Sequence, residues 1–147
     1  MKIALVCNLG GHLTQMFFLL EAFENHEIFF VTNNDPRIKQ IKYKKFIVEH
    51  INLSLLKMIK AFIKTFKILL NEKPDYIIST GAEIAIPFCI LGKIIGIKTI
   101  YIESWSRVKN PSKTGKILYY IADIFLVQWP DLLKEYGKKA RYEGGVV

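Results

Sequence analysis

The chain has 147 residues, a length typical of one domain, and a formal net charge of +8 at pH 7. Hydrophobic residues make up 51% of the chain and charged residues 23%, which excludes a disordered chain and predicts a sizeable buried core. Cys7 and Cys89 stand in apolar runs without a CxxC pair, which argues against a disulfide framework or a zinc site and favours a reducing, cytoplasmic compartment.

Strand-length apolar runs alternate with helix-length patterns along the chain. In chain order we expect a strand at 2–7, a helix at 12–25, strands at 27–32 and 46–49, a helix at 55–70, a strand at 75–79, a helix at 82–95, a strand at 98–102, a helix at 113–121, a strand at 124–128, a helix at 131–136 and a short strand at 140–143. Such alternation predicts parallel pairing through right-handed crossovers. The expected fold class is therefore α/β, with a doubly wound, mostly parallel sheet.

The apolar stretches predict neither a signal sequence nor a membrane span. Only five apolar residues follow Lys2 before polar residues and glycines intervene, too few for a secretory signal. Residues 84–102 are long enough to cross a bilayer, but Pro87, Gly96 and Lys98 interrupt them. A buried helix, a turn and a buried strand explain this punctuation better.

Polar residues cluster at the carboxyl ends of the expected strands, where ligands of open α/β sheets bind. If the strand order is 3-2-1-4-5, the loops after the first and fourth strands face one another. The clusters contain Asn8, Gly10, Gly11 and His12 after the first strand, Asn33, Asn34 and Asp35 after the second, Thr80, Gly81 and Glu83 after the fourth, and Glu103, Ser104 and Arg107 after the fifth.

The Gly10-Gly11 pair lies between a buried strand and a helix. Two glycines there allow a tight turn and bring backbone N–H groups toward a ligand at the positive end of the helix dipole, which suits a phosphate. A simple tight turn is the alternative. His12 stands at the mouth of the helix, where a neutral imidazole can accept a proton from a hydroxyl; a capping role is the alternative.

Positive charge is concentrated in one window of the sequence. Residues 37–73 contain ten Lys or Arg and two Glu, so this window carries the whole net charge. Four lysines of the 55–70 helix fall within an arc of roughly 80°, opposite a broad apolar face. They are Lys57, Lys60, Lys64 and Lys67. Either the apolar face packs on the sheet and the lysines are solvated, or the helix binds an anionic membrane surface. Only three of the 21 basic residues are Arg, so nucleic acid is the weaker partner.

Three segments resemble the acceptor-side half of the two-lobed GT-B glycosyltransferases. They are Ile78-Ser79-Thr80-Gly81-Ala82-Glu83-Ile84-Ala85-Ile86-Pro87, Tyr101-Ile102-Glu103-Ser104 and Gln128-Trp129-Pro130. Together with Gly10-Gly11-His12-Leu13-x-Gln15, they resemble the acceptor-side, membrane-anchoring subunit of the split N-acetylglucosaminyltransferase of asparagine-linked glycosylation and its bacterial capsule and exopolysaccharide relatives. More distantly, the chain is similar to the amino-terminal lobe of the peptidoglycan lipid-intermediate N-acetylglucosaminyltransferase.

This resemblance implies that residues 1–147 form a single Rossmann-like lobe of a GT-B fold. The lobe would bind a polyprenyl-phosphate-linked glycan acceptor, while a catalytic partner subunit would bind most of the nucleotide-sugar donor. The complex would transfer N-acetylglucosamine or another hexose, and the chain alone would be inactive. We expect peripheral attachment to the cytoplasmic face of the membrane in place of the amino-terminal span of eukaryotic relatives. The partner is expected to dock near residues 144–147.

The resemblance also implies roles for the strand-end residues. His12 is the expected base that activates the acceptor hydroxyl. Glu103 is the second catalytic candidate, with capping of the following loop as its alternative role. The expected acceptor and phosphate ligands are Asn8, Gly10, Gly11, Thr80, Gly81, Glu83, Ser104 and Arg107. We expect no metal and no cofactor, because a basic cleft and helix ends can stabilise a leaving diphosphate.

Two other classes of function stay open at this point. One is a nucleotide-dependent oxidoreductase, in which Asp35 would bind a ribose, although the three-glycine dinucleotide fingerprint is incomplete. The other is a basic adaptor that binds nucleic acid or a membrane without chemistry.

Overall fold

The computed structural model describes residues 1–34, 36–52 and 54–146. Within them, one sheet has the strand order β3-β2-β1-β4-β5-β6-β7, and all neighbouring strands are parallel. The strands are β1 (Lys2–Cys7), β2 (Glu27–Thr32), β3 (Lys44–Ile47), β4 (Tyr76–Gly81), β5 (Lys98–Ile102), β6 (Ile124–Leu126) and β7 (Ala140–Arg141). The expected α/β class is confirmed, and the strand order reverses between β1 and β4.

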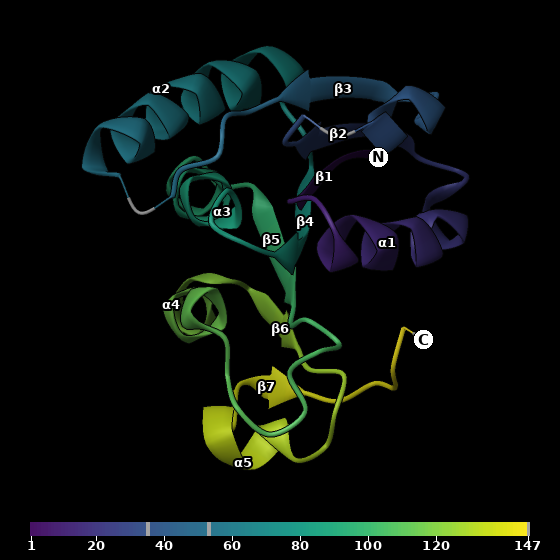
Figure 1. The fold of residues 1–147 in the computed structure, drawn as a ribbon, viewed down its shortest axis with the longest axis vertical. Coiled ribbons are helices and arrows are strands. Elements are labelled where there is room, and N and C mark those ends of the chain that lie inside the picture. Colours follow the sequence, from purple (N-terminus) through teal and green to yellow (C-terminus); the bar gives the residue numbers. More distant parts are fainter. Residues whose placement is uncertain (35, 53, 147) are drawn as a thin grey trace.

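Helices cover both faces of the sheet (Figure 1). The helices are α1 (Gly11–Phe18), α2 (Leu55–Glu72), α3 (Ala85–Ile94), α4 (Lys113–Ile121) and α5 (Leu132–Tyr136), with 3-10 turns η1 (Leu20–Phe23) and η2 (Pro36–Gln40). The α1 helix packs on one face through Leu13 and Met16. The other helices contribute to the core on the opposite face.

The central strands are buried on both faces, as their nearly continuous apolar sequences require. In β1, every residue from Ile3 to Cys7 is at most 3% exposed. Phe88 of α3 is fully buried against this sheet. Burying a side chain of this size contributes about 1.5–3 kcal/mol, so Phe88 stabilises the packing of α3 on the sheet.

Several element boundaries differ from the expected ones. The expected helix at 12–25 ends at Phe18 and continues as the 3-10 turn η1. The expected helix at 82–95 begins only at Ala85, because Gly81 and Ala82 have φ angles of 120° and 79°, outside the helical region. The strand β4 accordingly continues to Gly81.

The α2 helix is rotated about its axis relative to the sequence expectation. It turns a narrower face toward the sheet, in which Ala61, Thr65, Ile68, Leu69 and Glu72 are buried. The small side chains of Ala61 and Thr65 allow close packing there. Six apolar residues expected on the packed face are instead 43–76% exposed: Leu55, Leu56, Ile59, Ile63, Phe66 and Leu70. We call these six residues the apolar stripe.

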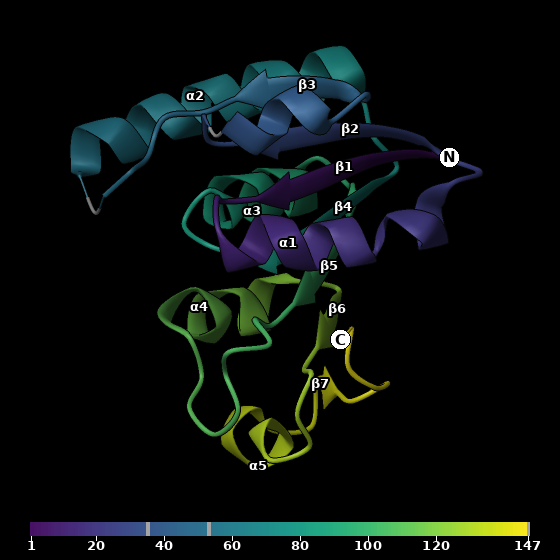
Figure 2. The same cartoon turned by 45° about the vertical axis from the view of Figure 1, so that its right-hand side comes forward.

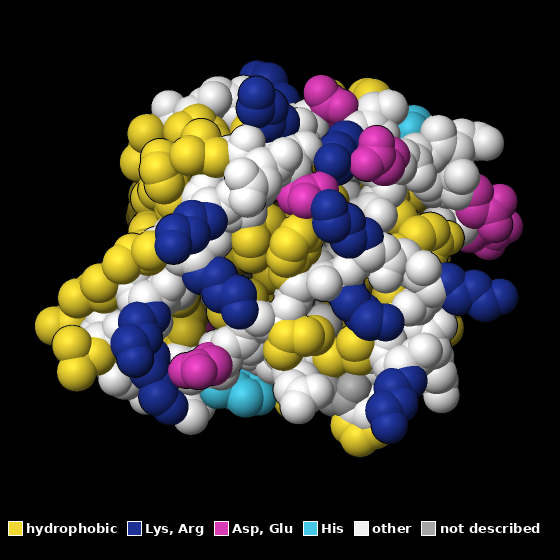
Figure 3. All heavy atoms as spheres, turned by 90° about the horizontal axis from the view of Figure 1, so that it is seen from above, with side chains coloured by type: hydrophobic (Ala, Val, Ile, Leu, Met, Phe, Trp, Pro, Cys, Tyr) yellow, Lys and Arg dark blue, Asp and Glu magenta, His cyan; other side chains and the backbone are white. Residues whose placement is uncertain are grey.

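The apolar stripe runs beside the lysines of the same helix. Figure 3 looks down on this side of the molecule and shows hydrophobic side chains along one margin, with Lys and Arg side chains in a row beside them. Figure 2 shows the first turn of α2 extending past the sheet. Of the two alternatives for this helix, packing of the apolar face on the sheet is therefore wrong for most of its residues.

Candidate functional site

A polar hollow of about 470 Å³ lies at the carboxyl edge of the sheet, beside the point where the strand order reverses. It is lined by residues from the start of α1, the turn after β4, the strand β5 with the segment that follows it, and the start of α4. The lining residues that matter for its chemistry are His12, Ser104, Arg107, Ser112, Lys113 and Lys116. We call this hollow the main site.

His12 is held in place by a reciprocal pair of hydrogen bonds with Thr80. The ring atom Nδ1 lies 2.7 Å from the carbonyl oxygen of Thr80, and the Thr80 hydroxyl donates to the carbonyl oxygen of His12 at 2.9 Å. Because a carbonyl oxygen only accepts, Nδ1 is the protonated nitrogen in this contact. A neutral His12 ring therefore keeps its lone pair on Nε2, the nitrogen that can accept a proton.

Glycine is required at two positions around His12. A Cβ atom at Gly81 would lie 2.7 Å from Cε1 and 2.9 Å from Nδ1 of the His12 ring, and Gly81 also has a φ of 120°. Gly10 precedes α1 with a φ of 74°, which favours glycine. The loops after β1 and β4 thus face one another as expected, and Gly81 gives the imidazole its space.

Glu103 is fully buried at the end of β5 and accepts several hydrogen bonds. Its Oε1 accepts from the Ser104 N–H at 2.8 Å and the Tyr101 hydroxyl at 3.3 Å. Its Oε2 accepts from the Ser112 N–H at 3.1 Å, the Ser112 hydroxyl at 2.9 Å and the Tyr136 hydroxyl. These donors stabilise a buried carboxylate and tie the loop between β5 and α4 to the sheet.

The two tyrosines beside Glu103 stay protonated. Burial raises the pKa of Tyr101 well above its ordinary value, and the charge of Glu103 raises it further. Burial also raises the pKa of Tyr136, and its hydrogen bond to Glu103 adds to this effect. Both hydroxyls therefore remain donors to Glu103 at neutral pH. This geometry favours the capping role of Glu103, and proton transfer by Glu103 stays a prediction.

The amino-terminal end of α4 adds positive charge that the sequence reasoning missed. Ser112 caps the helix by accepting from the Gly115 N–H at 2.8 Å, and no acidic residue stands in the first turn. Lys113 and Lys116 line the main site together with Arg107. Cations at this end of a helix oppose the helix dipole, so they are unfavourable unless an anion is bound nearby. Lys113 and Lys116 stand at the start of the expected 113–121 helix, so this unfavourable placement can be recognised in the sequence and indicates an anion site.

The remaining expected ligands lie at different distances from the main site. Ser104 and Arg107 line it, whereas Glu83 accepts a hydrogen bond from the Asn52 N–H at 2.9 Å, on the side toward α2. Asn8 and Asn33 follow the neighbouring strands β1 and β2, and each carries a buried Oδ1 atom without a hydrogen-bond partner. Asp35, the residue proposed to bind a ribose, lies outside the described residues.

A second hollow, of about 480 Å³, opens next to the main site and shares Ser106 with it. Trp105, Trp129, Tyr142 and Gly145 contribute to its lining. The Trp129 indole N–H donates to the carbonyl oxygen of Trp105 at 2.6 Å, so the two aromatic residues are fixed relative to one another. We call this second hollow the aromatic hollow.

The cysteines take no part in either hollow. Both thiols are free and buried, and burial raises the pKa of each to about 12, which keeps them protonated at neutral pH. In the described ranges no three His, Cys, Asp or Glu side chains gather closely enough to hold a metal ion.

The all-parallel sheet and the site at its reversal point define the class of protein, a Rossmann-like lobe, and its neighbours among solved structures are lobes of the GT-B type. Two solved structures share this fold. UDP-N-acetylglucosamine 2-epimerase from Rickettsia bellii has a TM-score of 0.77 and 16% sequence identity, covering 99% of this chain and 45% of that chain. MurG from Acinetobacter baumannii has a TM-score of 0.75 and 13% identity, covering 89% of this chain and 42% of that chain. The chain therefore spans less than half the length of either structure.

Sequence comparison identifies the family. Residues 32–146 match the family described as "Oligosaccharide biosynthesis protein Alg14 like". The chain is also 28% identical over 181 residues to the human protein named "UDP-N-acetylglucosamine transferase subunit ALG14", an alignment that covers 100% of this chain and 83% of the human protein. The chain belongs to the Alg14-like family of oligosaccharide biosynthesis proteins, and the resemblance seen in its sequence motifs is confirmed.

Proposed function

We propose that the chain is the acceptor-binding subunit of a two-subunit glycosyltransferase that extends a polyprenyl-phosphate-linked glycan. The observation that carries this proposal is the main site, where a histidine with a free Nε2 lone pair meets three basic side chains at the edge of a GT-B lobe. Family membership supports the same conclusion, and the human relative is named as a transferase subunit. Membership of this family favours neither the nucleotide-dependent oxidoreductase nor the basic adaptor.

In this proposal His12 is the general base. The acceptor hydroxyl attacks the anomeric carbon of the nucleotide-sugar, and Nε2 of His12 takes the hydroxyl proton while the bond to the leaving diphosphate breaks. The Thr80 carbonyl holds the ring in the required tautomer and stabilises the positive charge that the ring gains. The His12–Thr80 contact therefore supports both the orientation and the tautomer of the imidazole.

Arg107, Lys113 and Lys116 are the groups we assign to the acceptor phosphates. They surround one hollow together with the hydroxyl-bearing residues Ser104 and Ser112. Fixed positive charges stabilise a bound phosphate most strongly when the site is already organised before the phosphate binds. Glu103 keeps that organisation by holding the loop that carries Arg107 and the start of α4.

A partner chain supplies the donor-binding half in this proposal. The solved GT-B proteins are more than twice as long as the part that matches this chain. We place the docking surface at the aromatic hollow, because Trp105, Trp129 and Tyr142 line it beside the main site. Exposed tryptophan and tyrosine are enriched at the centres of protein interfaces.

Membrane attachment is the third part of the proposal. Among the described helices none has the length and hydrophobicity to cross a bilayer. The apolar stripe and the neighbouring lysines of α2 give the arrangement of a helix that lies in a membrane surface, with apolar side chains inserted and lysines at the headgroups. We propose that the chain binds the cytoplasmic face of the membrane peripherally in this way.

Reconstitution tests the proposal. The chain and its donor-binding partner are purified separately, and transfer from UDP-N-acetylglucosamine and other nucleotide-sugars to a polyprenyl-diphosphate-linked sugar is measured for each chain and for the mixture. We expect transfer only by the mixture. Transfer by this chain alone would contradict the two-subunit assignment. Tight NAD binding by the chain, without transfer by the mixture, would favour the oxidoreductase instead.

A further inference from the structure

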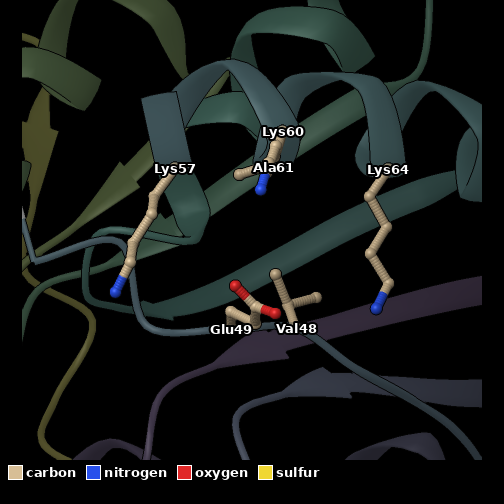
Figure 4. A pocket seen from close by; sticks show the side chains of 6 residues that line it. All are labelled: Val48, Glu49, Lys57, Lys60, Ala61 and Lys64. Atoms are coloured by element: carbon tan, nitrogen blue, oxygen red, sulfur yellow. The ribbon is translucent and has the colours of Figure 1, made fainter. Parts of the chain in front are cut away.

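A small groove separates α2 from the segment that follows β3 (Figure 4). Its volume is about 220 Å³, large enough for one phosphate group. Lys57, Lys60 and Lys64 reach into it from α2, and Val48 and Glu49 form the opposite wall. We call it the lysine groove.

The charges around the lysine groove are not balanced. Three ammonium groups face one carboxylate, and no ion pair in the described ranges includes any of the three lysines. The ammonium group of Lys64 donates to the carbonyl oxygen of Ile47, which fixes that side of the groove. Like charges that surround one hollow repel each other, so an anion placed among them is attracted by all three.

The position of the groove indicates the source of that anion. Along α2, at 100° per residue, the lysines occupy the sector between the apolar stripe and the buried face, with Lys60 about 40° from Leu56 of the stripe and Lys57 and Lys64 closer to the buried face. An amphiphile that touches both sectors would place its anionic head in the groove and its hydrocarbon against the stripe. A free anion would gain nothing from the stripe.

We propose that the lysine groove binds the phosphate group of a single membrane phospholipid. This inference rests on the membrane attachment proposed above and goes beyond it, because it assigns one bounded site instead of a diffuse attraction between charges. Two members of the groove, Lys57 and Lys60, donate to the phosphate oxygens. The Glu49 carboxylate on the opposite wall limits how tightly the anion binds.

Two single substitutions on the same helix separate a bounded site from diffuse attraction. Lys60→Gln and Lys67→Gln each remove one charge from α2, but only Lys60 lines the groove. Binding is measured by sedimentation with phosphatidylcholine vesicles that contain phosphatidic acid, at fixed salt. Lys67→Gln should weaken binding about fivefold, the diffuse contribution of one lysine. Lys60→Gln should weaken it roughly 10–100-fold, as expected for a lost hydrogen bond to a charged group.

The outcomes distinguish the groove from membrane attachment as such. Equal losses for the two variants would overturn the groove while leaving membrane attachment intact. If the unmodified chain ignores these vesicles, membrane attachment itself fails. Glu49→Gln removes the negative charge from the groove and should strengthen vesicle binding. The control is Glu24→Gln, whose exposed carboxylate lies outside the groove, and it should strengthen binding less.

A competition experiment with a soluble anion tests whether the phosphate comes from a lipid or from solution. Inorganic phosphate, added at constant ionic strength, should displace the unmodified chain from the vesicles only weakly because it makes no contact with the apolar stripe. Strong displacement that Lys60→Gln abolishes would assign the groove to free phosphate and overturn the lipid proposal.

Discussion

His12 and Thr80, 68 positions apart in the chain, exchange two hydrogen bonds across the point where the strand order reverses. One bond fixes the side chain of the histidine and the other fixes its backbone. The start of α1 and the carboxyl end of β4 are therefore joined through the proposed catalytic residue itself. The Thr80 carbonyl acts on the imidazole, whereas the Thr80 hydroxyl acts on the backbone of His12, so the two contacts can be tested separately.

The first prediction concerns His12. In the reconstituted complex, His12→Ala should lower turnover about 10²–10⁴-fold, the usual contribution of a general base, while the fold is retained. Thr80→Val is the control, because it removes the hydroxyl but keeps the carbonyl that binds Nδ1, and it should cost far less activity. Turnover and circular dichroism are measured for both. Near-normal turnover by His12→Ala would remove this residue from the mechanism.

The second prediction separates the two roles considered for Glu103. If Glu103 positions the α4 loop, Glu103→Gln should lower the free energy of unfolding by about 1–3 kcal/mol, because Gln cannot accept all the hydrogen bonds that the carboxylate accepts. Turnover by the reconstituted complex should fall together with the free energy of unfolding. A loss of turnover at unchanged stability, measured by urea unfolding, would instead favour proton transfer.

The same positioning role can be tested without changing Glu103. A Cβ atom at Gly115 would overlap the Tyr136 hydroxyl and Glu103 Oε2, and it would lie 2.8 Å from the Ser112 hydroxyl. Gly115→Ala should therefore displace the network around Glu103 and reproduce the loss of stability of Glu103→Gln. A stable and active Gly115→Ala variant would show that this network does not hold the site.

The third prediction concerns insertion of the apolar stripe. Leu56 and Ile59 are 73% and 50% exposed, so the double substitution Leu56→Gln, Ile59→Gln should leave stability nearly unchanged. It should abolish the part of vesicle binding that survives high salt, because that part depends on buried apolar surface. Ile94→Gln, at a residue 73% exposed at the end of α3, is the control. Salt-resistant binding by the double variant would exclude insertion through these residues.

The fourth prediction concerns acid stability. Hydrogen bonds from Lys44 and Lys2 lower the pKa of the buried Glu72 below its ordinary value of 4.5, and the pairs measure 2.5 Å and 2.9 Å. A lowered folded-state pKa contributes stability that is present above about pH 4.5 and is lost as the pH falls through the folded pKa. Thermal unfolding between pH 7 and pH 3 should therefore show a smaller acid-dependent loss for Glu72→Gln than for the unmodified chain. An equal acid-dependent loss of stability in the Glu72→Gln variant and the unmodified chain would contradict this role of Glu72.

The sequence predicted the sheet and much of the main site because both depend on local patterns. Apolar runs bounded by polar residues placed β1, β2 and β5 at their observed limits. The reversal between β1 and β4 then brought His12 to Thr80. The rotation of α2 was not predictable, because its apolar arc is wide enough to permit more than one packing and only contacts with β3 and α3 select among them. The place of Lys113 and Lys116 at the start of a helix is visible in the sequence, but only the folded chain shows that they line the same hollow as His12.

The two edges of the sheet restrict how another chain can join it. The edge strand β3 carries the exposed residues Lys44 and Lys45, and β7 at the other edge is only two residues long. Charged or very short edges discourage the addition of a further strand from another molecule. A partner subunit is therefore expected to bind through side chains at the carboxyl edge and not by β-augmentation. In the proposed complex the two subunits would then keep separate sheets that meet only through side-chain contacts.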